Sequence, residues 1–320
     1  MKTSVSPLHR RLRSVRRPYS ELLYSDGLRQ ALDEVLLDGY DVLHIDQLWA
    51  GWAGIGRART LLNIHHFEMI DWEDRDLTTL TELKAFVQMK RATHRLLKAL
   101  PRMRMFTPRL LDYAKSINDT AQYWVVPFAL DLSQYEMQPP IDQPVVGLIG
   151  SMHWLPSRSA GERLITRIWP LIKARVPQAK LRIAGWHAAK YLNHLLPARD
   201  VILDENLPHP SQFFSEVSVM AYAPSRGSGM KIKVLESMTY GVPVVTTWEG
   251  VEGIEYENGK HCWVEEDDSM LADRTCQLLE NPAEREQMRL AARSLVEERY
   301  SPGPVVERMT RIYEDISAGR

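Results

Sequence analysis

The clearest pattern in the chain is a pair of short apolar segments on either side of a segment with helical periodicity. Residues 217–222 (VSVMAY) are mostly apolar and 244–247 are VVTT, as in strands that are buried on both faces. Between them, apolar residues recur every three to four positions over 230–240, and the pattern ends at Gly241. These lengths predict a βαβ unit, whose two strands run parallel.

A turn rich in Gly and Ser, residues 224–229, joins the first strand of this unit to its helix. Parallel sheets bind ligands beyond the carboxyl ends of their strands, where this turn lies. Free backbone N–H groups and the helix dipole favour an anion there, and Arg226, Lys231 and Lys233 surround the turn. The sequence therefore predicts a phosphate site at this turn.

Helical geometry predicts which side chains face that site. At about 100° per residue, Lys233 and Glu236 share a face with Gly229, whereas Val234 lies on a core face. Lys231 is expected to matter less, because it points away from Lys233. The alternative is a surface Lys–Glu ion pair, which would contribute only a few tenths of a kcal/mol.

Three runs of sequence carry a family resemblance: RGSGMKIKVLESM (226–238), GVPVVTT (241–247) and GVEGI (250–254). Together they resemble the donor-binding signature of retaining family 4 glycosyltransferases, which have the GT-B fold. The resemblance implies that Arg226 and Lys233 hold the diphosphate of a nucleotide-sugar donor. It also implies that Glu236 accepts hydroxyl groups of the nucleotide ribose.

The resemblance extends to a second glycine turn, which follows the apolar segment 145–149. Many family members have a basic residue after this glycine, but this chain has His153 nearby, either as a donor contact or as a loop histidine without a role. Many members also have an acidic residue against the donor sugar, at the position that Ser228 occupies here. The predicted donor-binding set is Gly150, Ser151, His153, Arg226, Gly227, Ser228, Gly229, Lys231, Lys233 and Glu236.

In the N-terminal part, the run HHFE at 65–68 follows an apolar segment and resembles a family segment near the interdomain cleft. The resemblance implies catalytic roles for His65 and Glu68, although a histidine after a buried strand is equally often structural. The run DRD at 74–76 imitates a metal-binding motif. Because these acids directly precede a predicted helix over 77–100 and favour its dipole, we expect no metal site.

The predicted fold class is α/β, a GT-B arrangement of two Rossmann-like domains with parallel sheets. A Pro-rich segment after residue 137 predicts a linker. The expected division is an incomplete acceptor-side domain at 1–137, a donor-binding domain at 138–303 and a helix at 304–320 that crosses back. The N-terminal domain is expected to lack about two βα units of the family pattern. Its predicted strands are 42–45, 61–64, 103–106 and 123–126.

Composition narrows the classes of partner. A net charge of −1 over 320 residues argues against nucleic acid, and no apolar run approaches the roughly 18 residues that span a bilayer. Cys262 and Cys276 cannot form a disulfide framework and are expected to be packing residues in a reducing compartment. Residues 1–20 are basic without an acidic residue, which could target an organelle or touch a membrane. We expect a cytoplasmic protein, with peripheral contact at the inner face of a membrane as an option.

These observations predict a glycosyltransferase that moves a sugar from a nucleotide diphosphate-sugar to an acceptor hydroxyl. The resemblance implies retention of configuration, no metal and no cofactor, and a carbohydrate or lipid-linked acceptor in polysaccharide or glycoconjugate biosynthesis. One alternative is a truncated pseudoenzyme or nucleotide-binding partner protein without turnover. Another is a sugar-nucleotide epimerase of the same overall fold, which would need an acid/base set in the N-terminal half. The sequence does not identify the donor sugar.

Overall fold

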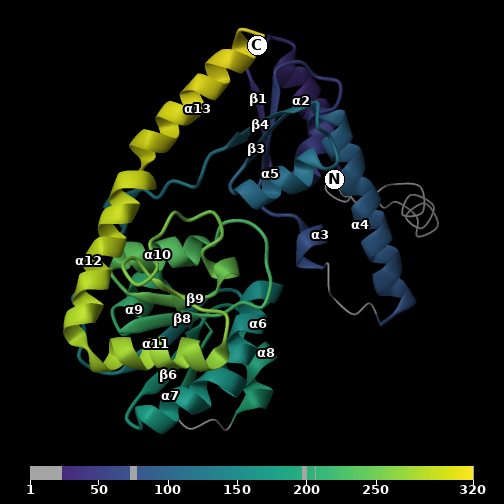
Figure 1. Cartoon of the computed structure of the whole chain (residues 1–320). Coiled ribbons are helices and arrows are strands. Elements are labelled where there is room, and N and C mark those ends of the chain that lie inside the picture. The colour runs from purple at the N-terminus through teal and green to yellow at the C-terminus, as the bar shows by residue number, and fades with distance from the viewer. Residues whose placement is uncertain (1–23, 73–77, 197–199, 206, 320) are drawn as a thin grey trace. The chain divides into compact units, whose positions relative to one another are not determined.

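A computed structural model of the chain describes residues 24–72, 78–196, 200–205 and 207–319. The chain divides into two compact units, each of which is described by itself (Figure 1). The N-terminal unit runs to Val126 and includes the chain from Glu307 onward, and the C-terminal unit is Pro127–Val306. Each unit has a parallel sheet with helices, so the predicted class of two Rossmann-like units is confirmed.

The N-terminal unit contains a four-stranded sheet in the order β1-β2-β3-β4, and every neighbouring pair is parallel. All residues of β2 are buried, as expected of a strand that is covered on both faces. Each of the four predicted strands agrees with the structure to within one residue at either end. The strands are β1 (Leu43–Asp46), β2 (Thr60–Ile64), β3 (Arg102–Met105) and β4 (Gln122–Val125).

Helices cover the N-terminal sheet, and the longest of them is α4 (Leu80–Ala99). It begins with a capping box in which Thr79 and Glu82 exchange hydrogen bonds, and its Leu96 and Leu97 pack in the core with the strands. The other elements are α2 (Asp26–Leu36), the 3-10 helix η2 (Leu48–Gly54), α3 (Glu68–Asp71), α5 (Pro108–Lys115) and the part of α13 (Pro302–Ser317) from Glu307. No helix of the described residues is long and apolar enough to cross a bilayer.

The C-terminal unit contains a six-stranded parallel sheet in the order β10-β9-β8-β5-β6-β7. The chain fills one side of β5 with β6 and β7, and then crosses to the other side to form β8, β9 and β10. This reversal places a topological switch point between β5 and β8, where open α/β sheets bind ligands. The strands are β5 (Val145–Ile149), β6 (Lys180–Ala184), β7 (Val201–Asp204), β8 (Val219–Tyr222), β9 (Val244–Thr246) and β10 (Trp263–Val264).

The helices of the C-terminal unit pack in groups on this sheet. Helix α11 contacts α7 and β8, and α10 contacts α9 and α12. Their bounds are α6 (Leu155–Arg163), the π-helical segment η4 (Leu164–Ile168), α7 (Trp169–Arg175), α8 (Ala188–Leu192), α9 (Pro210–Phe214), α10 (Ile232–Tyr240), α11 (Asp268–Glu280) and α12 (Pro282–Arg299). Short 3-10 turns lie at Leu132–Gln134, Asn193–Leu195 and Trp248–Gly250.

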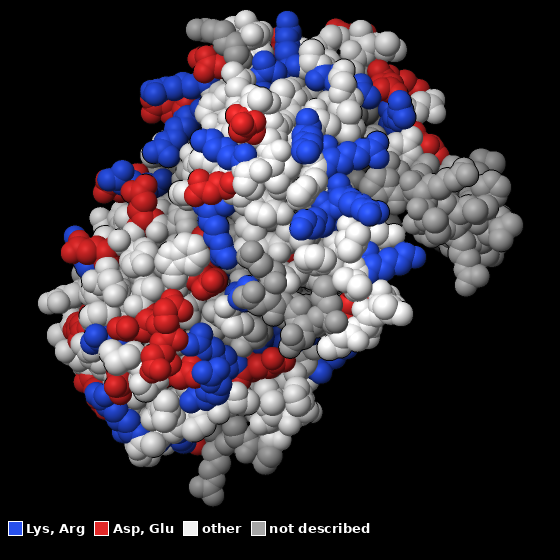
Figure 2. Space-filling model, turned by 45° about the vertical axis from the view of Figure 1, so that its right-hand side comes forward, with Lys and Arg blue, Asp and Glu red and all other residues white. Residues whose placement is uncertain are grey.

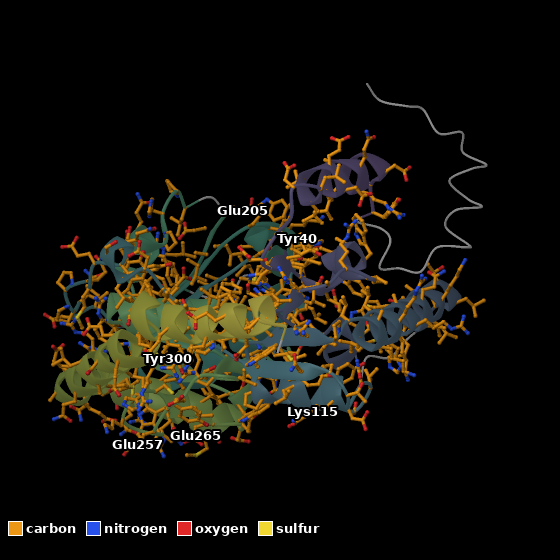
Figure 3. All side chains as sticks on the ribbon, turned by 90° about the horizontal axis from the view of Figure 1, so that it is seen from above. Tyr40, Lys115, Glu205, Glu257, Glu265 and Tyr300 are labelled. Atoms are coloured by element: carbon orange, nitrogen blue, oxygen red, sulfur yellow. The ribbon has the colours of Figure 1, made fainter. Side chains whose placement is uncertain are left out.

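Residues 127–137 belong to the C-terminal unit because their backbone is bonded to it. The Leu130 N–H donates to the carbonyl oxygen of Tyr300 (2.8 Å), and Arg293 Nη1 donates to the carbonyl oxygen of Tyr135 (2.9 Å). The Tyr300 hydroxyl also accepts a bond from the backbone N–H of Glu255, at 2.7 Å (Figure 3). The division between the units therefore falls at Val126 rather than at residue 137.

The two cysteines are packing residues, as predicted. Cys262 and Cys276 are both buried and neither forms a disulfide. Burial raises the pKa of the Cys262 thiol to about 12 and that of Cys276 to about 11. Both thiols are therefore protonated and unreactive near neutral pH.

Candidate functional site

The candidate site lies at the switch point of the C-terminal sheet, between β5 and β8. On the other side of β5, the turns after β5 and β6 touch. The Gly150 N–H donates to the carbonyl oxygen of Ala184 (2.9 Å). A Cβ atom on Gly185 would lie 2.1 Å from the carbonyl oxygen of Gly150, and both glycines have positive φ. Glycine is therefore required here, because any side chain would push the two turns apart.

Lys233, on the first turn of α10, reaches across to the turn after β5. Its Nζ donates to Ser157 Oγ at 2.5 Å, and a Cβ atom on Gly150 would lie 2.6 Å from the same Nζ. The Nζ also lies 4.8 Å from the ring centroids of both Trp154 and Tyr222. Two aromatic faces and a hydroxyl thus hold this ammonium group at the switch point.

The charge of Lys233 is poised near neutral pH. Burial, and next the neighbouring Lys231, lower the pKa of Lys233 to about 7, and Glu236 opposes this shift. An amine with this pKa changes its charge readily when an anion arrives. Lys233 therefore combines a fixed position with a charge that a bound diphosphate would stabilise.

Lys231 has a different environment from the one that the helical pattern predicts. Helix α10 begins at Ile232, so Lys231 is its N-cap residue and the assignment of Gly229 and Lys231 to helix faces is wrong. The side chain is buried, and its Nζ donates to the carbonyl oxygens of Gly229 (2.5 Å) and Gly227 (3.3 Å). Its Nζ also lies 3.8 Å from Oε2 of Glu252, which is buried too. Lys231 thus holds the glycine turn in shape.

The glycine turn after β8 brings backbone close to the turn after β5. Gly227 has φ 151°, and a Cβ atom there would lie 2.7 Å from Cγ of Pro156. Gly229 has φ 80°, in the left-handed region. On the same turn Ser228 is buried and Arg226 is half-buried. The structure therefore brings the predicted residues of this turn to one edge of the sheet with Gly150 and Lys233.

Glu236 has a partner that the sequence pattern did not reveal. The Tyr135 hydroxyl donates to Glu236 Oε1 at 3.3 Å. Burial raises the pKa of the Glu236 carboxyl, whereas the Tyr135 hydrogen bond and Lys233 oppose that rise. Burial and the nearby Glu236 also raise the pKa of Tyr135 to about 12, so its hydroxyl remains a donor. Tyr135 fixes the direction of the Glu236 carboxylate.

Tyr135→Phe is expected to weaken the binding of a nucleoside diphosphate about three- to tenfold, because one hydrogen bond that orients Glu236 is lost. Inorganic pyrophosphate contains no ribose, so its affinity should not change. Isothermal titration calorimetry with both ligands measures this difference. Tyr256→Phe, a change at a partly exposed tyrosine, is the matched control. An equal loss for both ligands would contradict the assigned role.

The turn after β5 carries two more predicted residues, Ser151 and His153, which have different surroundings. The Ser151 carbonyl oxygen accepts from the N–H of Trp154 (3.2 Å), which closes the turn. His153 is exposed, and its Nδ1 lies 3.4 Å from the hydroxyl of Tyr191. Its ring lies 6.3 Å from that of Trp186, which is 60% exposed. His153 thus belongs to an aromatic group beside the Gly150 turn.

The loops after β6 and β7 are tied together beside this group. The backbone N–H of Ala189, at the start of α8, donates to Glu205 Oε1 at 3.0 Å (Figure 3). Glu205 directly follows β7. This bond fixes one wall of the site next to the Gly150 turn.

His65 and Glu68 lie in the N-terminal unit. His65 Nε2 lies 2.6 Å from Oδ1 of Asp46, at the carboxyl end of β1. Glu68 accepts from Trp49 Nε1 (2.6 Å) and lies 3.6 Å from Nε2 of His66. The run DRD at 74–76 and residues 1–20 lie outside the described residues.

The carboxylates of Glu68 and Asp46 are both held in the ionised form. Burial alone would raise the pKa of Glu68, but hydrogen bonds from His66 and Trp49 lower it below its usual value. In the same way, bonds from His65 and Asn63 outweigh burial and lower the pKa of Asp46. A general acid near neutral pH needs a raised pKa, so Glu68 does not suit that role.

The chain resembles one protein-family model and several solved structures. Residues 143–281 match the family model described as glycosyl transferases group 1, and this segment includes every predicted donor-binding residue. No curated protein matches the sequence at significant similarity. The structure is similar to sucrose-phosphate synthase from Thermosynechococcus elongatus, with a TM-score of 0.73 and 16% identity over 92% of this chain and 78% of that one.

Two further solved structures show the same likeness. Staphylococcus aureus TarM, in a complex with UDP and α-GlcNAc-glycerol, has a TM-score of 0.70 at 15% identity, over 89% of this chain and 58% of that one. Anabaena HepE in complex with UDP-glucose has a TM-score of 0.66 at 15% identity, over 98% and 90%. The chain has the GT-B fold of these glycosyltransferase structures, and its residues 143–281 match the model of the group 1 glycosyltransferase family.

Proposed function

We propose that this chain transfers a sugar from a nucleoside diphosphate-sugar to an acceptor hydroxyl, with retention of configuration and without a metal ion. The observation that carries the proposal is the meeting of Lys233, the Gly150 turn and the turn at 227–229 at the switch point. Structures of similar fold contain UDP, UDP-glucose and α-GlcNAc-glycerol, which supports a uridine diphosphate donor and a carbohydrate acceptor.

In the proposed reaction, the acceptor oxygen bonds to the anomeric carbon while the bond from that carbon to the diphosphate oxygen breaks. The diphosphate leaves with the electron pair, and the acceptor proton passes to it or to solvent. Charge therefore grows on the diphosphate in the transition state. Lys233 and Arg226, with the N–H groups of the glycine turn, supply positive charge where that charge grows.

The other site residues position the two substrates. Glu236, held by Tyr135, accepts the ribose hydroxyls of the donor. Ser228 occupies the position where many family members have an acid against the donor sugar, so a small hydroxyl faces the sugar in this proposal. His65 and Glu68 remain proposed catalytic residues of the N-terminal unit, with Glu68 as an acceptor of hydrogen bonds from substrate hydroxyls. A lipid-linked or free carbohydrate is the proposed acceptor, in glycoconjugate biosynthesis.

A panel of UDP- and GDP-sugars tests the proposal. The assay measures the release of the nucleoside diphosphate, UDP or GDP, from each donor. We expect at least one donor to turn over, and EDTA to leave its rate unchanged, because cationic side chains and a helix terminus supply the charge that a metal would bring. Loss of turnover on chelation that manganese restores would refute metal independence. Nucleotide binding without turnover of any donor would favour a binding protein instead.

Arg226→Ala provides the matched test of the site in the same assay. It removes one charge-assisted hydrogen bond, so the affinity for UDP should fall about ten- to a hundredfold. Lys260→Ala, which removes an exposed cation on another loop, is the control. Equal affinities of both variants and the unaltered chain would remove Arg226 from the site.

A further inference from the structure

A short loop, residues 257–262, covers the outer edge of the C-terminal sheet. In the described part of the chain, β10 is the outermost strand on its side of that sheet. Asn258 Oδ1 accepts from the backbone N–H of Val264 (2.8 Å), and Asn258 Nδ2 donates to the Val264 carbonyl oxygen (3.3 Å). One side chain thus satisfies both backbone groups of Val264, which an open strand edge would offer to another chain.

Backbone hydrogen bonds close this loop on itself. The N–H groups of Lys260 and His261 both donate to the carbonyl oxygen of Glu257, each at 3.1 Å. The Gly259 N–H donates to the carbonyl oxygen of Cys262 at 2.8 Å. The loop is therefore a compact turn, which keeps its second residue against β10.

His261 adds a hydrogen bond that depends on its protonation state. The backbone N–H of Glu257 donates to Nδ1 of His261 at 3.0 Å (Glu257 is labelled in Figure 3). A backbone N–H can only donate, so Nδ1 must carry a lone pair, and the proton of the neutral ring lies on Nε2. A protonated histidine has an N–H at both positions and cannot accept this bond. Acid therefore places two donors face to face in the closed loop.

The nearest charges keep the ring neutral at neutral pH. Burial, and next the charge of Lys260, lower the pKa of His261, and Glu257 opposes this shift. Lys260 Nζ lies 2.9 Å from Glu257 Oε2, and this contact lowers the pKa of the Glu257 carboxyl. Glu257 therefore stays ionised between pH 7 and 5, and over that range the change of charge in this loop is that of His261.

The other charged groups near the ring line the same cavity as His261, which has a volume of about 410 Å³. Arg299, in α12, lies 3.0 Å from Oε1 of Glu298 and 3.9 Å from Oε2 of Glu255. Burial raises the pKa of the Tyr256 hydroxyl, so that group stays neutral. Figure 2 shows the same mixture of acidic and basic side chains over the C-terminal unit, in the lower half of the view. One negative charge is left in excess, which favours the imidazolium but cannot restore the lost bond.

We propose that His261 is a pH-dependent latch: its neutral ring holds the loop 257–262 closed over the edge of β10, and protonation releases the loop. In the open loop, the histidine regains its ordinary pKa of roughly 6.5. Because the closed loop binds the proton less readily, proton binding favours the open loop as the pH falls below that value. Opening frees both backbone groups of Val264, so acid exposes a strand edge that can pair with another chain. This proposal does not depend on glycosyl transfer.

Amide hydrogen exchange, followed by NMR on the full chain, tests the latch. The reporters are the amide protons of Glu257 and Val264, which donate to His261 and to Asn258 in the closed loop. After correction for the intrinsic exchange rates, their protection should be constant from pH 8 to 7. It should fall about tenfold by pH 5, since opening increases by up to about tenfold per pH unit below the pKa of the open loop. Constant protection down to pH 5, while the imidazole signals of His261 titrate, would overturn the proposal.

His261→Asn is the matched variant, because its side-chain oxygen can replace Nδ1 and accepts a hydrogen bond at any pH. Both reporter amides should then keep their protection down to pH 5. His194→Asn, the same change at an exposed histidine, should lose protection as the unaltered chain does. An equal fall in His261→Asn and the unaltered chain, or no fall in His194→Asn, would overturn the latch.

Circular dichroism shows whether each variant is folded, and the titration of the unaltered chain decides the question even if a variant is not. No readout uses turnover or nucleotide binding, so a negative result here leaves the proposed function untouched.

Discussion

Lys231→Met is expected to lower the free energy of unfolding of the C-terminal unit by about 3 kcal/mol, and to abolish nucleotide binding. The lysine is buried and donates to the carbonyl oxygens of Gly227 and Gly229, with Glu252 at 3.8 Å. Removing one partner of a buried ion pair costs roughly 3–5 kcal/mol, because the other charge stays buried. The turn would also lose the bonds that shape it.

Urea unfolding, followed by tryptophan fluorescence at pH 7, measures this change. Lys233→Met is the matched control, because the same substitution is made two positions away on the same segment. A double variant, Lys231→Met with Glu252→Gln, should recover part of the lost stability, since the uncompensated carboxylate is neutralised. If Lys231→Met unfolds at the same urea concentration as the unaltered chain, Lys231 does not hold the turn.

Local pattern predicted much of this fold because both sheets are parallel. Buried parallel strands are short apolar runs, and β5, for example, was predicted with its observed bounds, Val145–Ile149. The direction of the Lys231 side chain was predicted wrongly, because the helical pattern in the sequence begins at residue 230 and the helix itself begins at Ile232. The backbone of Lys231 is extended, with φ −97° and ψ 92°, so a 100° rotation does not apply to it.

The partners of the site residues were beyond any local pattern. Ser157 lies 76 positions from Lys233, and Tyr135 lies 101 positions from Glu236. Side chains so far apart in sequence meet only because β5 and β8 are neighbours and because residues 127–137 return to the C-terminal unit. The family resemblance predicts which residues face a ligand, whereas only the fold shows what holds these residues in place.

Lys233→Met is expected to raise the free energy of unfolding and, at the same time, to weaken donor binding. In the unaltered chain, burial lowers the pKa of Lys233 to about 7, whereas a lysine in an unfolded chain has a pKa of roughly 10.4. Between these values the unfolded state binds more protons, so the contribution of Lys233 destabilises the fold most below pH 7 and fades as the pH rises toward 10. The methionine variant should therefore be more stable by about 2 kcal/mol at pH 7, with no gain near pH 10.

The same pKa predicts how donor affinity depends on pH. The diphosphate of a UDP-sugar is esterified at both ends, so it does not itself titrate near neutrality. It favours the charged form of Lys233, and binding above pH 7 must therefore take up a proton. Affinity should fall by up to about tenfold per unit as the pH rises from 7 to 9.

Calorimetry in two buffers of different ionisation enthalpy at pH 8 measures that proton uptake. Lys233→Met should bind the UDP-sugar about a hundredfold more weakly at pH 7, and its affinity should not change with pH. Lys190→Met, which replaces a cation beside the ring of Tyr191, is the control and should keep the pH dependence of the unaltered chain. If the control and Lys233→Met behave alike, or if no proton is taken up at pH 8, the amine of Lys233 does not contact the donor diphosphate.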